Sequence, residues 1–450
     1  MTTTQPVAGT RDRHGAELRR RDYVSDTLRH LAYSRGFEPL AVPILEAADS
    51  FSETVVGRSP WPEWNPAGVF EVVVEDYTAG YRHRCGTRAA VLVPEGTVSV
   101  ARWIAGRLAE HGPAALPAKI CYDLPCHRNE PVDALSTAGG KLREFSQFGI
   151  EVIGAHTPAA DAEVIVFVRD ALAALGIGED AIRIRINDVA GFRRLAAASA
   201  LDHDQAVTVK EHLDALAECR AGKNPARAPD LHKTLSAALD EYEVPARLRP
   251  AWQLLASHDT GRVDHRVRRI LGADHAPTLD GLEDLRTRLT EAGVHVRVDL
   301  GVVRSHEYYT GVSFEVDVVH DTVVHAEIAG GGRYDKLIGH FTTPDIVPGP
   351  ATVPATGFAF GVERLTLFLE RTGLFDRPTT ATRQYRFSPA PADVLAVPRH
   401  DPGTVDAFLR AHRGADRRLR RVDVWLDRDN DPETVGAYAA ARGITEVTWC

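Results

Sequence analysis

The chain has 450 residues, 44% of them hydrophobic and 26% charged, and its 53 basic and 62 acidic side chains give a formal net charge of −9. This length allows two or three domains with full cores, and the acidic balance argues against a surface that coats nucleic acid broadly. The five cysteines are irregularly spaced, which predicts neither a disulfide framework nor a metal site. The N-terminus lacks an apolar signal segment, and no apolar run is long enough to span a bilayer. We therefore expect a soluble cytoplasmic protein.

The N-terminal part predicts a long helix followed by strands. An apolar stripe indicates a helix over about 15–35, which Gly36 ends. Strands are expected over 37–43, 70–76 and 89–93, and a helix over about 98–111. The turn before this helix, Pro94-Glu95-Gly96-Thr97, has a carboxylate and a hydroxyl that suit an ammonium ligand. Thr97 could instead cap the helix, and the turn alone favours that simpler interpretation.

Residues 120–154 predict an antiparallel hairpin around a loop of small residues over 133–140. Charged residues recur on its two alternating halves, and we expect one face to hold Arg128, Glu130, Arg143, Gln147 and Glu151. Buried charges need partners, so a salt-bridged structural hairpin is the plainer interpretation for any single residue. Five such groups in register favour a surface that binds an anion and an amine.

The rest of the chain predicts helices and strands with few chemical signals of their own. We expect a helix over 159–175, strands over 182–186, 294–299 and 312–318, and a helical region with no evident chemistry over 189–290. The glycine run 330–332 lets a backbone approach a ligand closely, but it is weak as an isolated motif. Arg364 stands near the start of a helix, where positive charge is disfavoured, and this indicates an anionic partner or a surface salt bridge.

These segments resemble a known family when they are taken in order. Pro43 after the long helix, the pair 128–130 with 143–145, and the segment 361–364 resemble the three signature motifs of class II aminoacyl-tRNA synthetases. Within that class the chain is similar to histidyl-tRNA synthetase, strongly over about residues 5–370 and weakly beyond. The motifs behind this likeness are residues 9–12, 94–97, 147–151, 304–310 and 330–335.

The resemblance implies an α+β fold, an antiparallel sheet flanked by helices, in a homodimer. It divides the chain into a catalytic core (1–187 and 291–371), a helical insertion (188–290), a linker (372–392) and a truncated α/β domain like an anticodon-binding domain (393–450). The implied activity is ATP- and Mg²⁺-dependent activation of an amino acid, most simply histidine or a close analogue, with release of pyrophosphate.

The resemblance also implies roles for individual residues. Arg128 and Arg304 would be the catalytic residues, clamping the reaction centre from opposite sides with planar, permanently charged guanidinium groups. Arg364 would hold the terminal phosphates. The implied ATP site consists of Arg128, Glu130, Arg143, Phe145 and Arg364. The implied amino-acid site consists of Glu95, Gly96, Thr97, Gln147, Glu151, Arg304, Tyr308, Tyr309 and Gly331.

The chain departs from the family pattern mainly where tRNA would be held. Val93 stands where the family usually has arginine, Ser305-His306-Glu307 replaces a common Gly-Leu-Asp, and Lys141 stands where a second arginine is usual. The loop after Glu130 is longer and lacks the run that family members use near the acceptor end of tRNA. We therefore expect a paralogue that passes its acyl group to an acceptor other than tRNA.

Three alternatives remain open. The protein could be a true histidyl-tRNA synthetase with a trimmed domain. It could be a histidine-sensing regulatory subunit of ATP phosphoribosyltransferase, although retention of Arg128, Arg143 and Arg364 disfavours this. It could be an RNA-binding or signalling module that only kept the fold, which the acidic chain without a long basic stretch disfavours.

Overall fold

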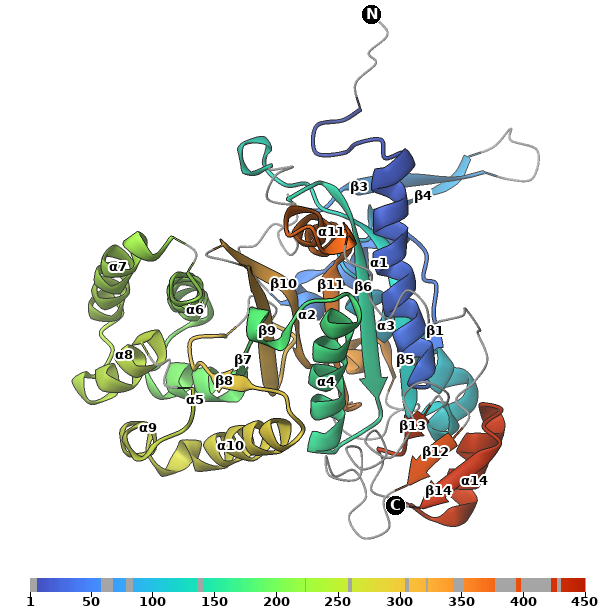
Figure 1. The fold of residues 1–450 in the computed structure, drawn as a ribbon. Helices are drawn as coiled ribbons and strands as arrows, with labels where there is room; N and C mark the ends of the chain where they lie inside the picture. The colour runs from blue at the N-terminus through green and yellow to red at the C-terminus, as the bar shows by residue number, and fades with distance from the viewer. Residues whose placement is uncertain are drawn as a thin grey trace, which may run out of the picture.

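The structure is a computed structural model that describes residues 6–57, 68–77, 84–135, 141–222, 224–257, 261–303, 307–320, 323–343, 352–376, 394–397, 422–426 and 430–449. Its centre is an eight-stranded mixed sheet in the order β1-β5-β6-β11-β10-β9-β7-β8 (Figure 1). In this spatial order the strands are Glu38–Pro39, Ala118–His127, Glu144–Ile153, Ala355–Gly361, Val323–Arg333, Val312–His320, Ile182–Asp188 and Val296–Val298. Neighbours are antiparallel except at the two edges, where β1 pairs with β5 and β7 with β8 in parallel. The expected α+β class with a largely antiparallel sheet is confirmed.

The expected hairpin is β5–β6, and its side chains alternate between two faces. Phe148 and Ile150 are buried on one side, whereas Gln147 and Glu151 point to the other. Strand pairing ends at the His127–Glu144 pair. The prediction that all five charged or amide groups share a strand face is therefore wrong for the three that follow β5 or precede β6, namely Arg128, Glu130 and Arg143.

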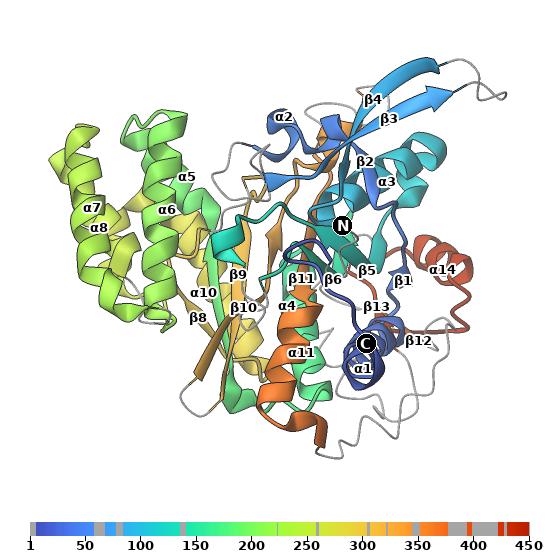
Figure 2. The same cartoon turned by 90° about the horizontal axis from the view of Figure 1, so that it is seen from above.

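Helices cover both faces of the large sheet (Figure 2). Helices α1 (Gly15–Ser34), α4 (Pro158–Ala174) and α11 (Val362–Arg371) lie on one face, where their apolar side chains join Phe148 and Ile150 in one core. Helix α1 ends before Gly36, whose φ of +77° is the left-handed conformation predicted for a helix stop. Helix α3 (Gly96–His111) lies on the other face with the opposite side chains of β5. The face under α3 is the one that holds Gln147 and Glu151.

A helical module and a small sheet flank this layer. Between β7 and β8 the described residues form six α-helices, shown in green and yellow in Figure 1: α5 (Val189–Ala198), α6 (His203–Arg220), α7 (Ala228–Glu241), α8 (Arg249–Ser257), α9 (His265–Leu271) and α10 (Ala276–Glu291). A three-stranded sheet, β2-β4-β3, consists of Leu45–Ala47, Arg84–Leu92 and Glu71–Tyr77, and short α2 (Glu53–Val56) follows β2.

The C-terminal segment forms a parallel sheet in the order β13-β12-β14, with α14 (Pro432–Ala441) beside it. Its strands are β12 (Val394–Val397), β13 (Val422–Val424) and β14 (Glu446–Trp449). Ala396, Val424 and Leu426 belong to the main core of the protein, so this unit is packed against the central layer. Most of the expected linker lies outside the described residues. Among the described helices, none combines the length and the apolar character that crossing a membrane requires.

Candidate active site

The centre of the candidate site is the carboxyl group of Glu151, which has no exposed surface. Its Oε1 accepts hydrogen bonds from Thr97 Oγ1 (3.1 Å) and Tyr122 OH (3.2 Å), and its Oε2 accepts one from Tyr334 OH (2.7 Å). Burial raises the pKa of Glu151 to about 8, and the hydroxyl donors offset part of that effect. In the described residues the hydrogen-bond partners of this carboxyl are neutral hydroxyls, so the group is readily protonated near neutral pH.

The Glu151 carboxyl group fits only because neighbouring positions are glycines. Gly357 pairs with Glu151 across β6 and β11, and a Cβ at 357 would lie 1.6 Å from Glu151 Oε2. Any larger residue there would have to displace the carboxyl group. The ring of Tyr122 lies against two more glycines, because a Cβ on Gly96 or Gly149 would lie 2.4 or 2.3 Å from it. The glycines of this region therefore bring backbone and aromatic ring close to one buried carboxyl.

Tyr122 and Tyr334 were not predicted from the sequence, although both hold Glu151. Burial raises the pKa of each phenol well above its ordinary value, and the charge of Glu151 adds to this, so both hydroxyls remain protonated donors. For Tyr122 a signal existed: it interrupts the apolar face of β5 directly opposite Gly149, and an aromatic ring commonly covers a cross-strand glycine. For Tyr334 only the tertiary structure reveals the partner.

Glu95 caps helix α3, and Thr97 does not. The Glu95 carboxylate accepts from Val98 N (2.8 Å) and Thr97 N (2.9 Å), so the helix begins at Gly96, two residues before the predicted start. The Thr97 hydroxyl does not cap the helix and donates to Glu151 Oε1 instead. Gly96 N donates to Gln147 Oε1 at 2.9 Å, which places the amide of Gln147 beside the same helix terminus. The pKa of Glu95 is raised above its ordinary value, because burial outweighs the opposing effects of the hydrogen bonds from Val98 and Thr97 and of the charge of Arg128.

The two tyrosines of the predicted amino-acid site lie beside this group. The ring centroids of Tyr308 and Tyr309 are 5.0 Å apart, and the Tyr308 ring meets that of Tyr334 edge-on at 6.1 Å. Tyr309 lies against Gly332, where a Cβ would be 2.9 Å from its ring. The Cβ direction of Gly331 points instead to Phe358 and Phe314 in the core, so Gly331 could contribute to the site only through its backbone.

Arginines gather at one end of the sheet, because the antiparallel register brings the C-terminal ends of β5 and β11 to the N-terminal end of β6. Arg128 follows β5, donates from Nε to Pro94 O (3.0 Å) and stacks on Phe145, with 4.8 Å from Cζ to the ring centroid. Arg143 precedes β6 and donates from Nε to Glu130 O at 3.0 Å. Its own N–H binds Gly9 O at 2.8 Å, so the N-terminal segment supports it.

Arg364 reaches the same end of the sheet from the first turn of α11. Its Nη1 donates to Glu327 O at 3.0 Å and lies 3.8 Å from Glu327 Oε2. The side chain is 37% exposed, so a ligand could reach it. The next residue back along the chain, Glu363, is buried and accepts from Ser146 N at 2.6 Å, which ties α11 to β6.

Glu130 offers a buried oxygen for a cation. Its Oε2 makes no hydrogen bond to any residue that the structure describes, although Lys141 Nζ lies 3.1 Å away as an ion pair. A hard carboxylate oxygen of this kind fits Mg²⁺, which binds through few protein carboxylates together with substrate phosphates. Within the described ranges no cluster of three metal-ligating side chains occurs, so a metal here would depend on phosphate oxygens for most of its ligands.

Several predicted features lie outside the described residues. Arg304, predicted as a catalytic residue, belongs to the segment 304–306, and the small-residue loop is described only up to 135 and from 141. The structure therefore brings together Glu95, Gly96, Thr97, Gln147, Glu151, Tyr308 and Tyr309 around one buried carboxyl, and Arg128, Arg143, Phe145 and Arg364 at the adjoining end of the sheet.

The antiparallel sheet, the hairpin that ends in paired arginines and the strand that turns into α11 define a class II aminoacyl-tRNA synthetase fold. Comparison with known proteins gives the family within that class. The family model for histidyl-tRNA synthetase matches residues 84–365, more than half of the chain. The chain belongs to the histidyl-tRNA synthetase family.

Relatives agree with this assignment, and a solved structure agrees with the fold. The chain is 29% identical to the histidine--tRNA ligase of Gluconacetobacter diazotrophicus over 448 residues, which cover 99% of this chain and 94% of that protein. It is 30% identical to the histidine--tRNA ligase of Gluconobacter oxydans, over 82% of this chain and 76% of that one. A solved structure from Bacillus halodurans, an ATP phosphoribosyltransferase regulatory subunit/histidyl-tRNA synthetase, superposes with a TM-score of 0.62 at 20% identity over 100% of both chains. At that identity the likeness concerns the fold alone.

Proposed function

We propose that this protein uses ATP to convert histidine or a close analogue into its aminoacyl-adenylate, with release of pyrophosphate. The observation that supports this most is the Glu151 site: a buried carboxyl held by three neutral hydroxyls beside Gln147 and a capped helix terminus. The reaction needs a pocket for a polar side chain, an ammonium site and an arginine-rich phosphate site next to one another. Each of these has a candidate in the described residues.

Selection of the amino acid would depend on Glu151 and Tyr309. An imidazole offers one N–H donor and one ring-nitrogen acceptor, and a carboxyl of pKa about 8 can accept from the first or, when protonated, donate to the second. An apolar competitor would leave the buried carboxyl without that partner, and a site built for hydrogen bonds discriminates strongly in this way. Glu95, Thr97 and Gln147 would receive the α-ammonium group.

Activation would depend on positioning and charge, because adenylyl transfer joins a carboxylate to the α-phosphate and both are anions. Arg128 is suited to this centre, since Pro94 O and the Phe145 ring hold its guanidinium and its charge acts on Glu95. Arg364, with Arg143 beside the end of the hairpin, would bind the terminal phosphates. Arg304 would complete the clamp from the opposite side. Mg²⁺, held through Glu130, would supply further neutralisation of the phosphate oxygens.

For the acceptor we propose a small amine or a carrier protein and not tRNA. The support comes from the altered loop over 131–142, including Lys141, which here forms an ion pair with Glu130. The C-terminal sheet supports the same view, because a residue of β13, Asp423, lies in a buried ion cluster with Lys119 of the core. A surface fixed in this way is less free to adapt to a tRNA than a separate domain would be.

A genuine histidine--tRNA ligase is the second candidate. It is favoured because the match extends over 94% of the length of the Gluconacetobacter protein.

We also propose that the protein is a homodimer, which light scattering on the purified protein would test.

The deciding experiment is amino-acid-dependent exchange of pyrophosphate into ATP, run with all twenty amino acids and followed by charging of a histidine tRNA transcript. We expect exchange with histidine or an analogue and no charging. Arg128→Ala and Arg364→Ala should abolish exchange while each variant remains folded. Undiminished exchange in either variant would refute the proposed mechanism. Exchange with efficient charging would support the second candidate, and histidine binding without exchange would support a regulatory subunit.

A further inference from the structure

Glu327 has a backbone conformation that residues other than glycine rarely adopt. Its φ is +56°, and it lies in β10 where the pairing with β9 shifts between His325 and Ala329, a β-bulge. Such a conformation persists only where surrounding contacts fix it, and it is common at functional sites. The residue is thus a candidate for a role that its neighbours in the strand do not share.

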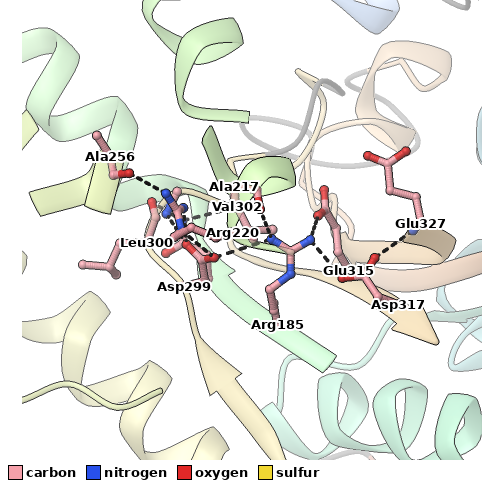
Figure 3. Close-up of polar contacts among 12 residues, drawn as sticks. Arg185, Ala217, Arg220, Ala256, Asp299, Leu300, Val302, Glu315, Asp317 and Glu327 are labelled. Atoms are coloured by element: carbon pink, nitrogen blue, oxygen red, sulfur yellow. Dashed lines mark hydrogen bonds and ion pairs between the residues drawn. The ribbon is translucent and has the colours of Figure 1, made fainter. Parts of the chain in front are cut away.

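Two hydrogen bonds hold the Glu327 backbone, one on each side. Its N–H donates to Asp317 Oδ1 at 2.8 Å, and its carbonyl accepts from Arg364 Nη1 at 3.0 Å (Figure 3 shows the first of these). Asp317 is 1% exposed, so its carboxylate is a fixed part of the interior. The orientation of the Glu327 carbonyl, and with it the position of the Arg364 guanidinium, therefore depends on Asp317.

Arg185 fixes Asp317 in turn. Its Nη2 lies 3.2 Å from Asp317 Oδ2 and 2.9 Å from Glu315 Oε2, and its Nη1 lies 3.5 Å from Asp299 Oδ2 (Figure 3). Burial alone would lower the pKa of Arg185, but the surrounding carboxylates raise it, so the guanidinium remains charged. A planar, five-donor group held on several sides leaves the Asp317 carboxylate little freedom to move.

The same network reaches the helical module. Arg220, the last residue of α6, donates from Nη2 to Asp299 Oδ1 at 2.7 Å and from Nη1 to the carbonyl of Ala256 in α8 (Figure 3). Asp299 also accepts from Gly301 N at 3.0 Å. Buried and partly buried polar contacts thus continue from the helical module through the sheet to Arg364.

We propose that Asp317 is a positioning residue for the nucleotide site: by holding the Glu327 N–H it fixes the left-handed bulge whose carbonyl orients Arg364 toward ATP. This inference rests on the proposed function only in that Arg364 contacts ATP. Asp317 itself would touch neither ATP nor the amino acid.

The test is the dissociation constant for ATP, measured by equilibrium dialysis on the full-length protein without amino acid. Asp317→Ala removes the acceptor for Glu327 N–H and should weaken ATP binding about tenfold. In the exchange assay the KM for ATP should rise by a similar factor, and the KM for the amino acid should change by less than about twofold. Unchanged ATP affinity in folded Asp317→Ala would overturn the proposal.

Glu315→Ala is the matched control. Glu315 lies on the same strand and binds the same Nη2 of Arg185, so its loss perturbs the charge network to a similar degree. The acceptor for the Glu327 N–H, however, is Asp317 and not Glu315. We expect Glu315→Ala to lower the thermal unfolding temperature and to change ATP affinity by no more than about threefold, against the tenfold loss expected for Asp317→Ala. Equal loss of affinity in both variants would mean a general electrostatic effect and would overturn the proposal.

Rescue distinguishes positioning from simple structural support. Glycine adopts positive φ without strain, so Asp317→Ala combined with Glu327→Gly should recover ATP affinity to within about threefold of wild type. Asp317→Asn retains an oxygen acceptor and should bind ATP nearly as well as wild type, which keeps the proposal testable if Asp317→Ala does not fold. Failure of the rescue, or a tenfold loss in folded Asp317→Asn, would overturn it.

The assay separates this inference from the proposed function. Wild-type protein that binds ATP but shows no exchange with any amino acid would refute adenylate formation and still allow the positioning test by affinity. Wild-type protein that binds no ATP would refute both.

Discussion

The helical module and the C-terminal sheet are both fastened to the central layer by buried charges, but by different cations. At the C-terminal unit Lys119 Nζ lies 2.5 Å from Asp423 Oδ1 and 2.7 Å from Glu163 Oε1, and it donates to Arg35 O at 2.7 Å. At the helical module two arginines, Arg185 and Arg220, share the carboxylate of Asp299, and Arg185 also pairs with Glu315 and Asp317 of β9.

The difference between the clusters follows from the two cations. An ammonium group is a compact charge, and Lys119 donates to Arg35 O and Asp423 Oδ1 and lies beside Glu163 as an ion pair. A guanidinium is a rigid fork that fixes the relative orientation of groups on both sides. The lysine cluster therefore fastens one unit to another at a point, whereas the arginine cluster relates the orientation of α6 to that of the β9–β10 bulge. Only the second has a path to a predicted ligand-binding residue in the described contacts.

The largest loss of stability is expected when the cation of the lysine cluster is removed. Burial alone would lower the pKa of Lys119, but Asp423 and Glu163 raise it, so the residue is charged. Lys119→Met would leave two buried carboxylates without a cation, and we expect a loss of about 3–5 kcal/mol in the free energy of unfolding, measured in urea. ATP affinity in the folded variant should remain within about twofold of wild type. A loss below about 1 kcal/mol would contradict this account.

The Glu151 site contrasts with both clusters, because in the described part of the chain this buried carboxyl is held by hydroxyl groups. Its pKa is raised from 4.5 to about 8 in the folded protein, so the folded state binds a proton that the unfolded state has released between these values. Its contribution to stability is therefore complete below about pH 4.5 and is lost as pH rises through about 8.

Glu151→Gln should remove this dependence, since the amide does not titrate. Between pH 5.5 and 7.5 the stability of wild type relative to the variant should fall by up to about 1.4 kcal/mol per pH unit, measured by urea unfolding at each pH. Parallel stability curves for the two proteins would show that Glu151 titrates normally.

Arg220→Met tests whether the arginine cluster joins the helical module to the nucleotide site. Asp299 would keep Arg185 and Gly301 N as partners, so we expect a smaller loss of about 2 kcal/mol in unfolding free energy. ATP affinity should also fall about threefold, in contrast to Lys119→Met. If both variants leave ATP affinity equal to wild type, the two clusters have the same structural role.

The smallest effect is expected at the exposed margin of the C-terminal unit. Arg442 Nε lies 3.4 Å from Glu38 Oε1, whose side chain is 54% exposed, and its guanidinium lies 3.9 Å from the centroid of the Tyr438 ring. Arg442→Ala should cost about 1 kcal/mol, because it removes an ion pair to an exposed carboxylate, one cation–π contact and the Nη2 hydrogen bond to Pro117 O (3.0 Å). A loss as large as that of Lys119→Met would mean that the C-terminal unit is held mainly by its surface contacts.

The sequence predicted those features that depend on local patterns. Period-two alternation predicted β5 and β6 and placed Gln147 and Glu151 on one face, and Gly36 marked the end of the first helix. It did not predict where the strands would end. Beyond the His127–Glu144 pair Arg128 N still donates to Arg143 O, but Arg143 N donates to Gly9 O of the N-terminal segment. The helix start was misplaced because a glutamate, not the threonine, satisfies its first N–H groups.

What the sequence determined alone is therefore the class of the fold, the faces of its strands and the motifs that resemble the histidyl-tRNA synthetase family. Only the tertiary structure decided which charged groups meet. Lys119 and Asp423 are 304 residues apart, and Tyr334 and Glu151 are 183 apart. Periodicity encodes the direction of a side chain within its own element, but the partner of a buried charge depends on which distant elements pack together, and no local pattern contains that information.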